Sequence, residues 1–303
     1  MKVNSGDMIK NMRMNIGVTQ EEFASRIYVS QRQLSRIENG KQEVDIWQFM
    51  SFMELLGLPT DDFWLMYLET KDYEYYLAYK QIKNLAWEDK ISETKELLDK
   101  LEKSPMSKHK FIRQFIDIYR IDLDVKMSHE QAIKENVKAM HICRPDFDEA
   151  KVSEYLLTYN EISIIIGIAI HAGALGDVER SVALHKAVID NREKIRASDE
   201  DKARFLPILM SNLSTILGRA GRYEESLEYC HKALDASRKY GNFHMIPNIL
   251  VNMASGYRLT GEEERVYMTY LNRAYQCALA FGSQKNIDII KKTAEESFGV
   301  KDL

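Results

Sequence analysis

The sequence is poor in cysteine and has no long apolar run. Three cysteines in 303 residues, at positions 143, 230 and 277, indicate reduced thiols rather than a disulfide framework. The apolar stretch at residues 162–170 is too short for a bilayer, which needs roughly 20 such residues. The opening segment, MKVNSGDMIKNMR, lacks the apolar core of a signal peptide. We therefore expect a cytoplasmic protein that does not enter a membrane.

The motifs of common catalytic and metal sites are missing as well. The chain has no Gly-rich phosphate loop, no HExxH and no nucleophile elbow. None of the seven histidines lies four residues from another, which is the spacing that brings two ligands to one helix face. We expect no metal, no cofactor and no catalytic residues, and so a protein that is not an enzyme.

The pattern of residues 19–40, TQEEFASRIYVSQRQLSRIENG, predicts two short helices joined by a tight turn. Thr19 and Ser30 are the expected N-caps, because each is followed at the third position by a Glu or Gln. Asn39-Gly40 ends the second helix, as a residue tolerant of positive φ followed by Gly should. The expected core positions, which let the two helices cross closely, are Phe23, Ala24, Ile27, Val29, Leu34 and Ile37.

The second of these helices carries polar side chains on its outer face. Gln pairs with adenine and Arg with guanine in the DNA major groove, and the N-terminal end of a helix favours phosphate. We expect Gln31 and Arg36 to read bases. The candidate DNA-binding residues are Arg13, Gln20, Ser30, Gln31, Arg32, Ser35, Arg36 and Lys41. The alternative is an ordinary helical hairpin with no DNA role.

This stretch resembles the helix-turn-helix of the phage-repressor-like (XRE) family, whose run T-Q-x-x-φ-A … S-x-x-x-[IL]-S-x-x-E-N-G stands here almost letter for letter. It departs at Tyr28, where the family's turn often has Gly. A net charge of −4, with seven basic and seven acidic residues in the first 60, is not that of a general nucleic-acid binder. Because Arg26 and other basic residues gather on or beside the expected DNA face, we expect site-specific, salt-sensitive binding.

From Tyr73 onward the pattern is helical and repetitive, with no useful strand-like alternation. Three segments share one spacing of small residue, large residue, turn Gly and second amphipathic helix, with the turns at Gly176, Gly221 and Gly261. They look like tetratricopeptide repeats, although the Gly-to-Gly offsets of 45 and 40 residues exceed the usual ~34. Two poorer copies precede them, at residues 75–103 and 111–142, and residues 286–298 look like a capping helix.

The expected fold is therefore all-α: an N-terminal helix-turn-helix followed by a right-handed superhelix of about five tetratricopeptide-like repeats. The expected domains are residues 1–60 for DNA binding, a linker helix at 61–72, and residues 73–303 for peptide binding and dimerisation.

Two sets of polar side chains on the inner repeat helices are candidates for peptide binding. Asn212 and Asn252 occupy one repeat position, and Asn160 lies on the corresponding face of an earlier helix. Asn can bond both the N–H and the C=O of an extended chain, but it can equally tie neighbouring helices together. Arg113 and Arg120 share a helix face with two aspartates, and they either grip a peptide carboxylate or form a salt-bridged surface.

The combination resembles the peptide-pheromone-responsive regulators of Gram-positive bacteria, the Rgg/PlcR/NprR group. The resemblance covers the whole chain in architecture and implies that Asn160, Asn212 and Asn252 hold a short, re-imported signalling peptide. It implies a homodimer on a pseudo-palindromic operator of double-stranded DNA, since protein two-fold symmetry is mirrored in the site. One alternative is a helix-turn-helix regulator whose repeats dock a protein partner. A second is an adaptor that regulates an enzyme, with a vestigial head.

Overall fold

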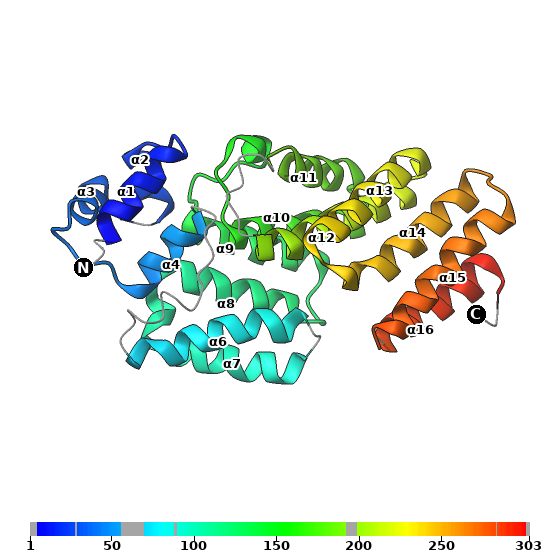
Figure 1. Ribbon diagram of the computed structural model, residues 1–303, viewed down its shortest axis with the longest axis horizontal. Helices are drawn as coiled ribbons and strands as arrows, with labels where there is room; N and C mark the ends of the chain where they lie inside the picture. Colours follow the sequence, from blue (N-terminus) through cyan, green and yellow to red (C-terminus); the bar gives the residue numbers. More distant parts are fainter. Residues whose placement is uncertain are drawn as a thin grey trace. The chain divides into compact units, whose positions relative to one another are not determined.

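The computed structural model describes residues 5–27, 29–55, 70–87, 90–191, 199–282 and 284–300, and regular secondary structure in these ranges is helical throughout (Figure 1). The chain divides into two compact units: Met1–Ile168 with Asn191–Ser198, and Ala169–Asp190 with Asp199–Leu303. Tyr28 and the helix expected at residues 61–68 lie outside the described residues. The expected boundary between residues 60 and 61 also lies outside them, and α6 already begins at Thr70.

Four of the described helices form the N-terminal head: α1 (Ser5–Asn15), α2 (Gln20–Arg26), α3 (Gln31–Glu38) and α4 (Ile46–Leu55). The caps expected from the sequence are confirmed. Thr19 Oγ1 accepts from the Glu22 N–H at 3.1 Å and Ser30 Oγ from the Gln33 N–H at 3.1 Å. Gly40, with φ of 66°, follows the end of α3.

The head has its own apolar core, which the sequence predicts well. All six positions expected at the crossing of α2 and α3 are at most 9% exposed. Ile9 of α1 and Phe52 and Leu55 of α4 belong to the same cluster, and the Phe23 and Phe52 rings stack with their centroids 5.9 Å apart. Burial of this apolar surface, at about 25 cal/mol per Å², holds the short helices together, because helices of 7 and 8 residues are not stable alone.

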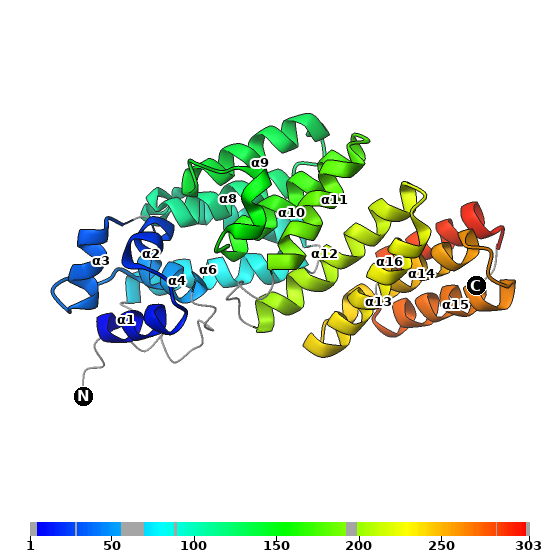
Figure 2. The same cartoon turned by 90° about the horizontal axis from the view of Figure 1, so that it is seen from above.

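The other described helices follow in the order expected for repeats, as successive pairs with α16 after the last pair. They are α6 (Thr70–Trp87), α7 (Ile91–Lys103), α8 (Lys110–Asp122), α9 (His129–Cys143), α10 (Tyr159–Ala174), α11 (Val178–Asp190), α12 (Asp199–Arg219), α13 (Tyr223–Tyr240), α14 (Ile246–Leu259), α15 (Glu264–Ala280) and α16 (Gln284–Thr293). Short 3-10 turns at Pro105–Lys108, Glu149–Glu154 and Phe243–Met245 and a π turn at Ala294–Phe298 lie between or after them. Figures 1 and 2 show α12 and α13, and likewise α14 and α15, packed as helical hairpins.

The repeat signature is confirmed at its characteristic positions. Gly176, Gly221 and Gly261 turn the chain between paired helices with φ of 86°, 76° and 86°, a region that residues with a Cβ rarely adopt. The small residues predicted on the first helices, Ala169, Ser214 and Ala254, are all 0% exposed. The described part of the chain thus has the all-α, repeat-containing fold that the sequence predicts.

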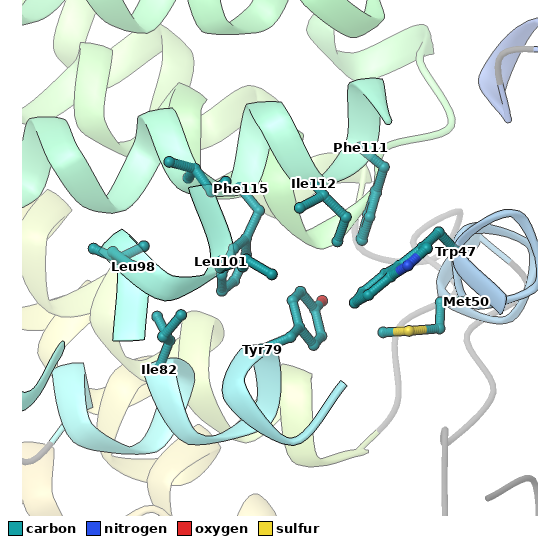
Figure 3. Close-up of a cluster of buried hydrophobic side chains, with 10 residues drawn as sticks. Trp47, Met50, Tyr79, Ile82, Leu98, Leu101, Phe111, Ile112 and Phe115 are labelled. Atoms are coloured by element: carbon teal, nitrogen blue, oxygen red, sulfur yellow. The ribbon is translucent and has the colours of Figure 1, made fainter. Parts of the chain in front are cut away.

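One feature of the first unit is not predicted. Trp47 and Met50 of α4 do not pack in the head core but in a second cluster, with side chains of α6, α7 and α8 (Figure 3). Trp47 meets Tyr79 edge-on at 6.3 Å, and Tyr79 in turn contacts Phe115 at 4.4 Å between ring centroids. The head and the first two repeats therefore share an aromatic core.

None of the described helices is both long enough and apolar enough to span a membrane.

Candidate nucleic-acid interface and repeat sites

The recognition-type helix α3 presents a polar, cationic face to solvent. Ser30, Gln31, Arg32 and Arg36 are exposed, and Lys41 follows the helix end and is exposed too. Among the described residues, none makes a hydrogen bond or ion pair with the side chain of Gln31, Arg32 or Arg36. Ser35 is half-buried, and its carbonyl accepts from the Asn39 amide at 2.6 Å.

The carboxylate of α3 is turned inward. Glu38, 1% exposed, receives Arg13 Nε at 2.6 Å and Nη2 at 3.0 Å. Gln20 Nε2 donates to the same carboxylate at 2.7 Å, and Arg13 Nη1 to the Val18 carbonyl at 2.8 Å. This bidentate pair ties α1 to α3 with charge-assisted bonds. It also removes a negative charge from the outer face of α3.

Arg13 and Gln20, two candidate DNA-binding residues, are therefore engaged inside the head. Arg13 is only 8% exposed, and a contact with DNA would require its bonds to Glu38 to be shared or broken. Their role toward DNA stays a prediction. In the ranges that the structure describes, the exposed candidates Gln31, Arg32, Arg36 and Lys41 have no such competing bond.

Arg26 lies elsewhere than the sequence predicts. Its Nη1 is 3.6 Å from Glu161 Oε1 of α10, and its side chain is only 13% exposed. Glu161 also accepts from Arg144 Nε at 3.0 Å and from the Thr158 N–H at 2.9 Å. The Arg144 guanidinium lies over the Tyr155 ring, 4.0 Å from its centroid. Arg26 thus faces the repeats because this carboxylate offers it a buried partner.

The sequence gives only part of this arrangement. Thr158 and Glu161 form a capping box, visible in the letters T-x-x-E. Nothing in the spacing of residues indicates that Arg26 and Arg144, from distant segments, share that glutamate. We call Arg26, Arg144 and Glu161 the carboxylate hub.

The Arg–Asp stripe on α8 lies in an open cavity of about 610 Å³ between α7 and α9. Arg113 bonds Asp117 at 2.7 Å and Glu102 at 3.1 Å. Arg120 bonds Glu102 at 3.0 Å and also Asp99. The lining residues are Lys95, Arg113, Asp117, Arg120, Ile121, Leu123, Asp124, Met127, Glu135, Lys138, Ala139 and Ile142.

The charges of this cavity perturb one another. Burial raises the pKa of Asp117, and its bond to Arg113 opposes the shift. The bond from Arg120 lowers the pKa of Asp99. Both arginines are thus paired, so a ligand carboxylate there would compete with acidic residues already in place.

The three candidate asparagines have different surroundings. Asn160, 1% exposed, donates to the Phe111 carbonyl at 3.2 Å and ties α10 to α8. Asn252 donates to Ser214 Oγ at 3.0 Å and Thr215 Oγ1 at 2.9 Å, which ties α14 to α12. Asn212 is half-buried, and its side chain makes no hydrogen bond with the described residues. Asn160 belongs to the first unit and the other two to the second.

Comparison with known proteins supports both parts of the architecture. Residues 9–63 match the helix-turn-helix family HTH_3. The fold is similar to PlcR of Bacillus thuringiensis in complex with the peptide PapR7 and DNA, at 19% identity and a TM-score of 0.63, over 95% of this chain and 98% of that one. Apo PlcR matches at 18% identity and a TM-score of 0.58, over 94% of this chain and 97% of that chain.

A second kind of protein shares the fold. ComR from S. thermophilus, in complex with DNA and its signalling peptide ComS, matches at 15% identity and a TM-score of 0.52, over 98% of this chain and all of that chain. A search of curated proteins finds no match. The chain therefore has a helix-turn-helix domain and the overall fold of PlcR and ComR.

Proposed function

We propose that the protein is a cytoplasmic, DNA-binding transcriptional regulator, not an enzyme, and that its repeat domain senses a short signalling peptide. The observation that carries the DNA-binding part is the face of α3. Gln31, Arg32 and Arg36 are exposed there and have no partner among the described residues, while Glu38 is neutralised inside by Arg13. Such a face offers donors to base edges and phosphates, and no opposing carboxylate.

The peptide part rests on the shared fold together with the inner repeat helices. PlcR and ComR have structures with both a peptide and DNA. In this chain we propose Arg113, Arg120, Asn160, Asn212 and Asn252 as the peptide-binding residues. Asn212 is the strongest of them, because its half-buried amide makes no hydrogen bond within the described part of the chain and can bond a peptide backbone.

We further propose a homodimer on a pseudo-palindromic operator, with a peptide that changes the placement of the two heads. Such control requires that the peptide bind two arrangements with different affinity. Analytical ultracentrifugation of the full chain gives its oligomeric state directly, and a monomer at tens of micromolar would exclude this dimer.

The experiment that tests the whole proposal uses genomic DNA fragments and peptides secreted by the source cells. The protein is mixed with the fragments, bound DNA is sequenced, and the affinity for the enriched site is measured with and without fractionated culture peptides at one salt concentration. A peptide-dependent change in affinity is expected. No enriched site would overturn the DNA-binding part. An enriched site whose affinity changes only when a cellular protein is added would favour a docked protein partner.

A further inference from the structure

A small cavity lies where α4 faces the start of α8. Its volume is about 210 Å³, and it is lined by Ile27, Trp47, Gln48, Ser51, Lys108, His109, Lys110 and Phe111. The first four of these belong to the segment that matches the helix-turn-helix family, and the last four to the repeats. None of the eight lining residues is acidic, and two are lysines.

Two independent features of this cavity favour an acceptor with negative charge. The first is the N-terminal end of α8, a helix of 13 residues whose N-cap residue, His109, makes no side-chain capping hydrogen bond. The residues at that end, His109, Lys110 and Phe111, form part of the cavity wall. The positive end of the helix dipole therefore lies at the cavity, as in sites that hold phosphate or carboxylate.

The second feature is Trp47. The side chain is 1% exposed and lines the cavity, and its indole Nε1 is buried without a hydrogen-bond partner in the described part of the chain. Buried donors are nearly always bonded, and an indole N–H can only donate. An acceptor placed in the cavity would satisfy this group, and 210 Å³ is ample for a tetrahedral oxyanion.

We propose that this cavity is a binding site for a small oxyanion of the phosphate class, held by the N-terminal end of α8, Lys108 and the Trp47 indole N–H. Because its walls come from the head segment and from the repeats, a bound anion contacts both. Ligand binding to the folded state stabilises it by mass action, so the anion strengthens the contact between α4 and α8. The site lies outside α3 and goes beyond the proposed function.

The indole N–H signals of the full-length, 15N-labelled protein test this site. The chain has three tryptophans, Trp47, Trp64 and Trp87, so the other two are internal controls, and Trp47→Phe identifies the signal. Inorganic phosphate is titrated at constant ionic strength, with chloride as the matched salt. We expect a saturable downfield shift of the Trp47 proton with phosphate, no such shift with chloride, and unmoved control signals.

Charge-matched variants separate a built site from a general salt effect. Lys108→Gln should weaken phosphate binding about fivefold, the effect of one nearby charge. Lys126→Gln, an exposed lysine outside the cavity, should leave it unchanged. A short DNA duplex, added in place of phosphate, shows whether the oxyanion is a free ion or a backbone phosphate. The proposal is overturned if neither phosphate nor the duplex moves the Trp47 signal, or if chloride moves it as much as phosphate does. It is also overturned if Lys108→Gln leaves the affinity for phosphate unchanged. The phosphate, chloride and Lys108→Gln outcomes do not depend on operator binding, so they are distinguishable from a failure of the proposed function.

Discussion

Arg26 of the head and Glu161 of the third repeat meet at 3.6 Å in a buried contact. They come from segments 135 positions apart in the sequence, and Glu161 also holds Arg144 at 3.0 Å. The Glu161 carboxylate is thus the shared counter-charge of two guanidinium groups, and both lose it if this carboxylate is removed. Together with the aromatic cluster around Trp47, the carboxylate hub fixes how the head contacts the repeats within the first unit.

Replacing Glu161 by Gln should destabilise the first unit strongly. The substitution preserves shape but leaves Arg144, 0% exposed, buried without its counter-charge. Breaking a buried pair in this way costs about 3–5 kcal/mol. We expect a clear fall in the thermal unfolding temperature of the first unit. Glu179→Gln is the matched control, since Glu179 pairs with Arg222 at 3.5 Å but its side chain is 84% exposed. Equal, small effects of both variants would contradict a structural role for the hub.

Arg36→Ala should weaken specific DNA binding without destabilising the head. The side chain is exposed and without a partner in the described structure, and a good bidentate contact to a base is worth about 1–3 kcal/mol of discrimination. Operator and random-DNA affinities are measured at one salt concentration, beside a thermal melt. Equal losses on both DNAs would make Arg36 a phosphate contact rather than a base reader.

Arg13→Ala serves as the contrasting variant for this experiment. It strands Glu38, which is 1% exposed, and should lower the unfolding temperature of the head by the loss of a buried pair. If Arg13→Ala instead leaves stability unchanged and abolishes DNA binding, Arg13 acts at the DNA and its bond to Glu38 is secondary.

The fold was predictable from local signals. Caps at Thr19 and Ser30 and the turn glycines follow from short-range rules that need only a few neighbouring letters. The contacts of Arg26, Trp47 and Glu38 were not predictable in the same way. They depend on which segments meet in space, and an arginine beside a recognition helix has the same sequence signature whether it faces DNA or a buried carboxylate.

The surroundings of Asn212 and Asn252 were likewise not predictable from local sequence. The two residues occupy the same repeat position but have different environments. Asn252 bonds three atoms of α12, whereas Asn212 has none in the described part of the chain. The spacing of the repeats fixes the position of each side chain on its helix. The hydrogen bonds it makes depend on the neighbouring helix, where Ser214 and Thr215 provide acceptors for Asn252.

Asn212→Ala and Asn252→Ala should therefore behave differently. Asn212→Ala should weaken peptide binding by about 1–3 kcal/mol, because a desolvated peptide group loses its partner, and should leave the melting temperature unchanged. Asn252→Ala should lower the melting temperature, because it removes bonds between α14 and α12. Calorimetry with the identified peptide, beside thermal melts, measures both effects. If Asn212→Ala binds at wild-type affinity, Asn212 is not part of the peptide site.

The second unit should lose stability in mild acid because of His185. The ring is 0% exposed, its Nδ1 lies 2.8 Å from the Ser181 carbonyl, and burial lowers its pKa from 6.5 to about 4. The folded state therefore holds a neutral imidazole at a pH where the unfolded chain binds a proton. The stabilising contribution is complete above the unfolded pKa of 6.5 and is lost as pH falls toward about 4. One proton over that interval corresponds to about 3 kcal/mol.

His185→Gln should remove this acid sensitivity, although it can lower the stability at neutral pH. The measurement is the unfolding free energy of wild type and variant at several pH values between neutrality and about pH 4, compared as slopes rather than as absolute values. His141→Gln, at an exposed position, should retain the wild-type slope. The slope of the unfolding free energy against pH counts the protons bound on unfolding. If His185→Gln keeps the full wild-type slope, the acid sensitivity comes from other groups. His185 would then titrate normally in the folded protein.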